Sequence, residues 1–169
     1  GAYSSAAGYV AHTQGRRGAF VESSGNITTY GDSQLVRMTL RGQTTDATAK
    51  VLTADTLNAA SAATTFSLMT YQTCAVKGLV VARDPAALAD WAIWEFTAMI
   101  NQDANAASTS LLAAVTPTLL GSGGTGNTWA LTVTADTAIG GLAITATGEA
   151  AKTVTWGCKL DGLEVRDIA

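Results

Sequence analysis

The sequence predicts an all-β protein: an antiparallel, jelly-roll-like β-sandwich of about eight strands, preceded by a short β-roll or coil segment. Stretches of alternating apolar and polar residues recur roughly every ten to fifteen residues, as in half-buried strands. Turn residues separate these stretches, and the helical crossovers that a parallel sheet needs are missing from the pattern. Only 14% of the residues are charged, against ~25% in average globular proteins, so we expect another subunit to cover part of the β-structure.

Three glycines, Gly1, Gly8 and Gly15, divide the N-terminal residues into steps of seven. Such a step fits one short strand and one tight turn, and glycine adopts the positive φ of a turn without steric cost. Because repeat units are stabilised by stacked neighbours, we expect this segment to continue a longer coil or to pack against copies of itself. With the turn-rich connector behind it, the segment forms a first region, residues 1–32, before a sandwich domain over residues 33–169.

The first strand of the sandwich is predicted at 33–41, where apolar and polar residues begin to alternate. A second is predicted at 44–55, where a similar pattern recurs. The stretch 64–84 is the longest β-rich segment and exceeds a typical strand in length. We therefore expect a turn or bulge near Lys77 and Gly78, where glycine interrupts the run.

Residues 85–103 allow two interpretations. Pro85 suits the first turn of a helix, with Asp84 as its N-cap. In contrast, residues 91–100 alternate between two largely apolar faces, which is typical of a buried strand. We predict a loop through Asp90 and then a strand.

The last third of the chain reads as further strands joined by short loops. Gly121, Gly123, Gly124 and Gly126 mark a flexible Gly/Ser/Thr loop at 119–127, which lacks the Lys-Ser/Thr pair of a phosphate-binding loop. The remaining predicted strands are 108–116, 129–134, 142–147 and 154–158, the last two joined by a hairpin loop at 148–152.

Cys74 and Cys158 are too few to form a disulfide framework in a chain of 169 residues. The main interpretation is two small apolar residues in strands, with free thiols. The alternatives are a disulfide between them or one across subunits. A metal site is not predicted, because the chain has one histidine and no CxxC pair.

No catalytic constellation is visible, so we predict that the protein is not an enzyme and takes no cofactor. His12 is the only histidine, and the acidic residues are scattered, mostly at turns, without the facing pair that glycoside hydrolysis needs. Glu95, in an apolar strand, is the one acid for which we expect a desolvated setting that raises the pKa. We interpret it as a salt-bridge partner of Arg83 or Arg37.

Charge and hydropathy exclude two classes of partner. The net charge is −3, and no basic run extends beyond Arg16 and Arg17, which argues against nucleic-acid binding. No apolar stretch reaches 18 residues, so membrane insertion is not predicted.

Four tryptophans raise the question of sugar stacking, since aromatic rings cover sugar faces as they cover other apolar surfaces. All four lie in or beside alternating strands, which favours core packing or a subunit interface. Trp91, beside the loop that ends at Asp90, is the candidate for binding a glycan. The other three are Trp94, Trp129 and Trp156.

The run from Gly1 to Gly15 resembles the glycine-punctuated repeats of trimeric adhesin heads, which also occur in bacteriophage fibres. Further motifs resemble a β-rich domain at the ends of phage tail fibre and virion spike proteins. They lie at 18–20, 30–34, 40–45, 81–83, 135–137 and 142–149. The resemblance implies a homotrimeric structural protein of the virion, assembled in the host cytoplasm, in contact with other virion proteins and with host cell-surface polysaccharide. It implies no catalytic residues.

Our leading hypothesis is a receptor-binding fibre or spike segment of a bacteriophage, in which three equivalent sites contribute to host attachment. The alternative is a capsid decoration or connector protein that binds only other virion proteins. A depolymerising enzyme is a third possibility, and the missing carboxylate pair argues against it.

Overall fold

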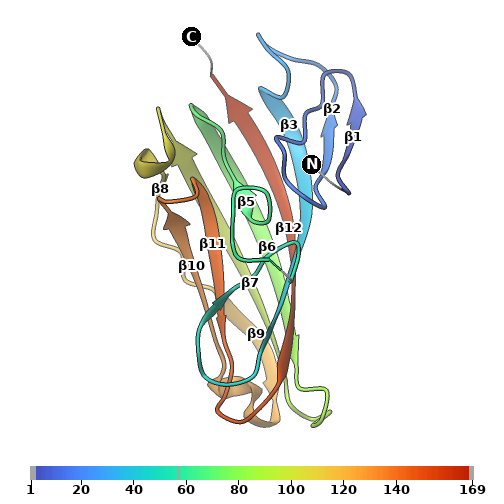
Figure 1. Cartoon of the computed structure of the whole chain (residues 1–169), viewed down its shortest axis with the longest axis vertical. Helices are drawn as coiled ribbons and strands as arrows, with labels where there is room; N and C mark the ends of the chain where they lie inside the picture. The colour runs from blue at the N-terminus through green and yellow to red at the C-terminus, as the bar shows by residue number, and fades with distance from the viewer. Residues whose placement is uncertain (1–2, 57, 168–169) are drawn as a thin grey trace.

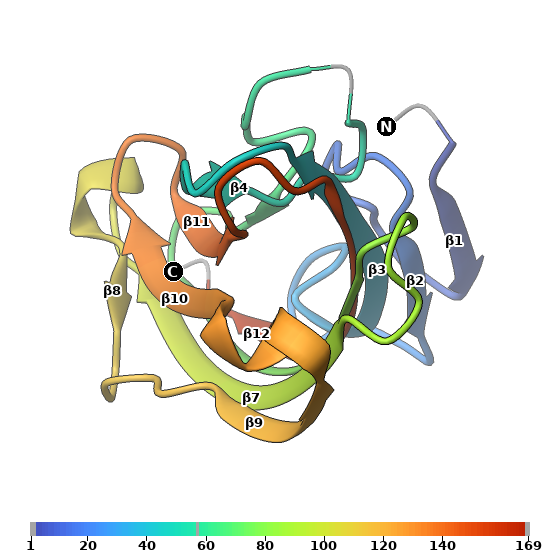
Figure 2. The ribbon, with the colours of Figure 1, turned by 90° about the horizontal axis from the view of Figure 1, so that it is seen from below.

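The computed structural model describes residues 3–56 and 58–167, and over these residues the fold is an all-β sandwich, as predicted. A large sheet and a small sheet lie against each other, and the strands of the large sheet run along the longest axis of the molecule (Figure 1). Seen from below, the large sheet bends around the core and the small sheet faces it from the other side (Figure 2).

Four long antiparallel strands form the centre of the large sheet, in the order β3 (Ser33–Thr44), β12 (Val154–Arg166), β6 (Gln72–Arg83) and β7 (Trp91–Gln102). In each strand, buried and more exposed residues alternate along nearly the whole length. The sequence alternation therefore corresponds to an inward face and an outward face of one sheet.

Short strands extend the large sheet at both edges. On one side, β2 (Phe20–Ser23) pairs antiparallel with β3, and β1 (Ser5–Gly8) pairs parallel with β2. On the other side, β8 (Ser110–Leu111) and β9 (Thr118–Gly123) both pair with β7, near its opposite ends.

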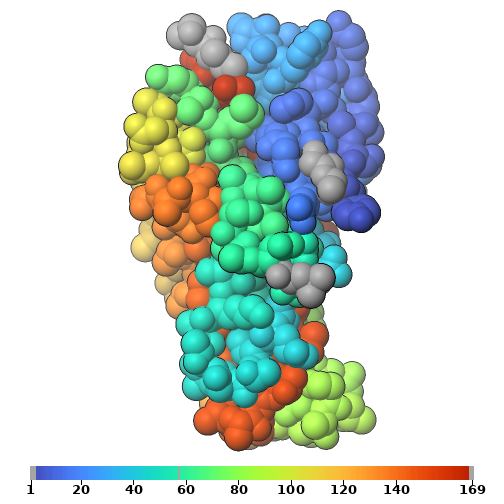
Figure 3. Space-filling model, viewed as in Figure 1, coloured from blue at the N-terminus to red at the C-terminus, as the bar shows by residue number. Residues whose placement is uncertain are grey.

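The small sheet is a hairpin with two short additions. Strands β10 (Ala130–Asp136) and β11 (Gly141–Thr147) form the hairpin, and β4 (Lys50–Val51) and β5 (Phe66–Ser67) pair with β11. Residues 52–56 and 58–71, between β4 and β6, lie beside this hairpin and cover the same side of the molecule together with it (Figure 3).

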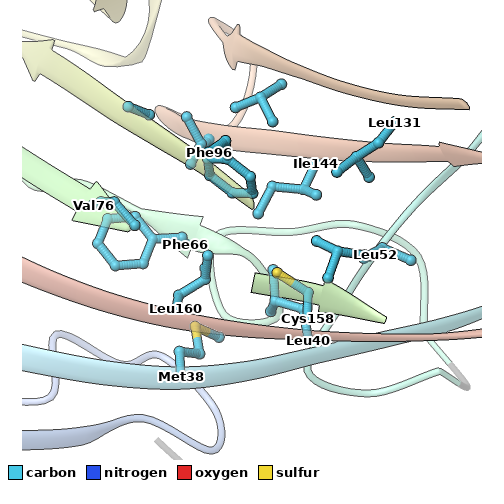
Figure 4. Close-up of a cluster of buried hydrophobic side chains, with 14 of the residues drawn as sticks. Met38, Leu40, Leu52, Phe66, Val76, Phe96, Leu131, Ile144, Cys158 and Leu160 are labelled. Atoms are coloured by element: carbon cyan, nitrogen blue, oxygen red, sulfur yellow. The ribbon is translucent and has the colours of Figure 1, made fainter. Parts of the chain in front are cut away.

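The core between the sheets is continuous and apolar, with side chains from both sheets meeting in the centre (Figure 4). Three tryptophans gather at its lower end: the ring centroids of Trp94 and Trp129 lie 5.7 Å and 5.9 Å from that of Trp156. The indole Nε1 of Trp156 donates a hydrogen bond to Thr44 Oγ1 at 3.0 Å. These three rings are core residues, as predicted.

Several local predictions were wrong. The described residues form about twelve strands rather than eight, because short edge pieces were missed. Strand β6 runs through Lys77 and Gly78 without a turn or bulge, since the Phe96 ring occupies the space where a Gly78 side chain would lie. The predicted strand 108–116 contains a strand only at β8, whereas the predicted loop 119–127 contributes most of β9.

The N-terminal segment shares its sheet and its core with the rest of the chain. Gly8 and Gly15 adopt the positive φ values expected of turns, +89° and +76°, while Gly1 lies outside the described residues. Ala19 and Val21 belong to the core between the sheets. Strand β3 begins at Ser33, where we predicted the sandwich to start, and β2 continues the same sheet.

Candidate functional site

The candidate site is the outward face of the large sheet, which faces away from the small sheet and from the viewer in Figure 1. Strand register sets its side chains in rows across β3, β12, β6 and β7. Neighbours in a row are close enough for direct contact, about 5 Å between Cβ atoms. From the upper end downward, the first row is polar apart from Val165, the second is apolar, the middle rows are charged, and the lower rows are mixed.

The upper end carries a complete apolar row, Leu35, Leu163, Ala75 and Met99, one residue from each long strand. Around it we define the upper patch as Phe20, Leu35, Met99, Leu163 and Val165, each 39–52% exposed. Leu35 and Leu163 are direct register partners, and Ala75 links Leu163 to Met99. Phe20 and Val165 lie in the two neighbouring rows. Contiguous exposed apolar area of this kind marks interaction sites more often than free surface.

A charged belt crosses the middle of the face. Asp161 Oδ1 lies 3.4 Å from Arg37 Nε, and its Oδ2 lies 2.6 Å from Lys159 Nζ. Lys77 and Glu95 complete the belt on β6 and β7. A shallow hollow of about 390 Å³ between belt and upper patch is lined by residues of both.

The environment of Glu95 differs from the one that we predicted. It lies exposed on the outward face, so the desolvated environment that we expected is absent. Neither Arg83 nor Arg37 forms an ion pair with it among the described residues.

The lower end of the face is built around Trp91, which is 37% exposed, unlike the three buried tryptophans. Its indole leans over β9, where Gly121 and Gly123 lie beneath it: a side chain on Gly121 would meet the ring at 3.5 Å, and one on Gly123 would overlap it. On the other side, Trp91, Leu88, Val81 and Arg83 line a hollow of about 360 Å³.

A second hollow, of about 450 Å³, adjoins the first and is lined by Val81, Arg83, Pro85, Thr155, Trp156 and Gly157. Arg41, on β3, lies opposite Gly157 on β12, and no atom approaches the place of a Gly157 side chain within 4 Å. Neither Arg41 nor Arg83 has a carboxylate partner in the part of the chain that the structure describes. We call Arg41, Arg83, Leu88, Trp91 and Gly157 the lower site.

A polar cluster fixes the loops beneath the lower site. Lys152 Nζ lies 2.8 Å from Asp90 Oδ2, 3.2 Å from Glu149 Oε2 and 2.6 Å from Thr125 Oγ1. Hydrogen bonding by Lys152 lowers the pKa of Asp90, and hydrogen bonding by Thr125 and Lys152 lowers that of Glu149. Because Asp90 immediately precedes Trp91, the cluster holds the start of β7 in place.

The most buried ion pair of the described chain joins Arg16 to Glu164, both fully buried, with N–O distances of 2.5 and 2.9 Å. Gln34 donates to the same carboxylate at 2.9 Å, and the Arg16 guanidinium lies 5.1 Å from the centre of the Phe66 ring. We did not predict this pair. The signal was present in the alternation of β12, which places Glu164 on the inward face with Trp156 and Leu160.

Cys74 and Cys158 are buried free thiols in strands, in agreement with the main interpretation. Cys74 pairs in register with Glu164, six residues along β12 from Cys158, which separates the two cysteines by about 20 Å. A disulfide between them within one chain is therefore ruled out. Burial raises the pKa of both thiols, that of Cys158 to about 12.

His12 is exposed, and its backbone amide donates to Gln34 Oε1 at 3.1 Å. The described residues contain no cluster of three metal-ligating side chains. Nor does any of their helices have the length and hydropathy required to cross a membrane. No protein-family model, curated protein or solved structure matches the chain.

Proposed function

We propose that the protein is a homotrimeric structural segment of a bacteriophage tail fibre or virion spike, and that it contributes to attachment at the host surface. The upper patch is the observation that carries the assembly part of this proposal. Each of the four long strands contributes one residue to an exposed apolar row. Exposed Leu and Met side chains do not stabilise a monomer in water, so we expect a partner to cover them. The resemblance of the N-terminal run to trimeric adhesin repeats supports a stoichiometry of three.

The upper half of the outward face is large enough for about half of one partner's share of a stable interface. Four strands of twelve or thirteen residues cover roughly 40 by 19 Å, so the upper half supplies ~400 Å². A stable interface buries about 800 Å² per partner. The N-terminal segment joins the same sheet through β2 and carries further exposed apolar side chains, which add to the apolar surface available to the assembly as a whole. Its most exposed large side chains are Tyr3, Tyr9, Ile27 and Tyr30.

A closed trimer needs two different surfaces on each copy, because its contacts run head to tail. The upper patch and the aromatic N-terminal segment are two such surfaces in one chain. We propose that the first, on one copy, packs against the second on the next. This arrangement would leave the lower site free on all three copies.

The test compares oligomeric mass in solution between matched variants. The wild-type chain is expected to have the mass of a trimer, and Leu35→Glu combined with Leu163→Glu to have that of a monomer. Thr39→Glu combined with Gln43→Glu adds the same charge to the outward face of β3 but outside the patch, and should keep the trimer. A wild-type monomer would contradict the proposal. Stoichiometric binding of that monomer to another virion protein would instead support the decoration or connector role.

A further inference from the structure

We propose that the lower site binds an acidic polysaccharide whose sugar rings carry carboxylates. This inference rests on the proposed attachment function and names its ligand class. The two kinds of group that such a ligand needs, a presented aromatic ring and unpaired cations, occur together in one place on the outward face.

Trp91 provides the stacking surface. Its indole lies over Gly121 and Gly123 of β9, so the neighbouring strand supports the ring without side chains that would tilt or cover it. The hollow between the ring and Val81, Leu88 and Arg83 is predominantly apolar. A sugar ring in this hollow would pack its C–H groups against both the aromatic ring and the aliphatic side chains.

Arg83 and Arg41 provide the positive charge. Arg83 lies beside Trp91 in the lowest row, and Arg41 lies two strands away in the next row, about 12 Å from Arg83 between Cα atoms. Gly157 lies between the two arginines and has no side chain, so the surface that joins them is not blocked at this position. Guanidinium groups bind carboxylates with two parallel hydrogen bonds. A separation of this size suits two carboxylates on one polymer chain better than a single small anion.

Nearby acids are engaged elsewhere and leave the two arginines available. Asp84 is buried and accepts a hydrogen bond from the Ala86 amide at 2.8 Å, and Asp90 is held by Lys152. The four long strands together present Arg37, Arg41, Lys77, Arg83 and Lys159 outward against only Glu95 and Asp161. This face is therefore cationic in a chain of net charge −3, which argues for a specific acidic partner rather than general basicity.

The experiment measures binding of the wild-type protein to three purified polymers by isothermal titration calorimetry: polygalacturonate, neutral dextran and polyphosphate. Binding is expected for polygalacturonate alone. Trp91→Ala and Arg83→Gln are each expected to weaken it about tenfold or more. The melting temperature should stay unchanged in Arg83→Gln, whose side chain is exposed. Trp91→Phe should retain most of the affinity. Lys77→Gln, which removes a cation from the belt on the same face, should have little effect.

Other outcomes would overturn the inference in distinguishable ways. If the protein is a trimer but binds none of the polymers, the ligand proposal is wrong and the assembly proposal stands. Equal binding of polyphosphate shows that the site selects charge alone. An equal loss in Lys77→Gln shows nonspecific electrostatic attraction. A change of oligomeric mass in Trp91→Ala shows that the lower site is a contact between copies instead.

Discussion

Strand β12 presents two different surfaces on its alternate residues. Its inward side chains, among them Trp156, Leu160 and Glu164, are fully buried and hold the two sheets and the N-terminal segment together. Its outward side chains, such as Asp161 and Leu163, lie on the face that we assign to assembly and binding. Residues one position apart are thus expected to affect different properties: stability on the inward side, and association on the outward side.

The largest effect is expected for the buried ion pair. Glu164→Gln leaves the Arg16 guanidinium buried without its counter-charge, and should lower the free energy of unfolding by about 3–5 kcal/mol. Asp161→Asn, on the other side of the same strand, breaks partly exposed ion pairs and should cost less than about 1 kcal/mol. Urea unfolding at a fixed protein concentration measures both. Equal losses of unfolding free energy in the two variants would show that the face of the strand on which a residue lies does not determine its effect on stability.

Two leucines on β12 give the second comparison. Leu160 is completely buried and Leu163 is 52% exposed. Leu160→Ala should lower the free energy of unfolding by about 2–5 kcal/mol, since it leaves a cavity between the sheets. In the isolated chain, Leu163→Ala should change it by no more than about 0.5 kcal/mol, and should instead weaken association. Dilution series followed by light scattering measure the association, and an unchanged dissociation midpoint in Leu163→Ala would contradict the assignment of the upper patch.

A smaller, pH-dependent effect is expected at the polar cluster below the lower site. Asp90 has a lowered pKa in the folded protein, chiefly through its hydrogen bond with Lys152. Its stabilising contribution is therefore present above its ordinary value of 3.8 and is lost as the pH falls through the lower, folded value.

Lys152→Met should accordingly reduce the melting temperature at neutral pH, and the difference from wild type should shrink as the pH falls below 3.8. Melting curves across this range test it, with exposed Lys50→Met as the control. A difference that stays constant on acidification would show that Lys152 acts through packing rather than through its acidic partners.

The smallest effect concerns the thiols. Burial raises the pKa of Cys158 to about 12 and raises that of Cys74 as well, so neither forms an appreciable thiolate near neutral pH. A thiol reagent should label neither cysteine in the native protein, and both after unfolding. Chains should migrate singly on a non-reducing gel. A covalent dimer on that gel would instead identify a disulfide across subunits.

Long strands were predictable because their alternation is strong. The strand from Trp91 was chosen correctly over a helix, since alternation across two apolar faces outweighed the helix-start signal at Pro85. The exposure that sets Trp91 apart from the other tryptophans also follows from its place beside a loop. Whether this exposed ring binds a glycan remains a prediction.

Other features depend on contacts between residues far apart in the chain. Gly78 looks like a strand breaker until the Phe96 ring from the next strand is placed over it. The pairing of Arg16 with Glu164 joins positions 148 residues apart, and local context made Glu95 the more conspicuous acid. The polar and apolar rows of the outward face emerge only from strand register.

The most direct test of the assembly proposal is native mass spectrometry of the wild-type chain at micromolar concentration, beside the Leu35→Glu, Leu163→Glu double variant. We predict three chains per particle for the wild type and one for the variant, with the same fold by circular dichroism. A wild-type protein that remains a single chain at this concentration would contradict the account.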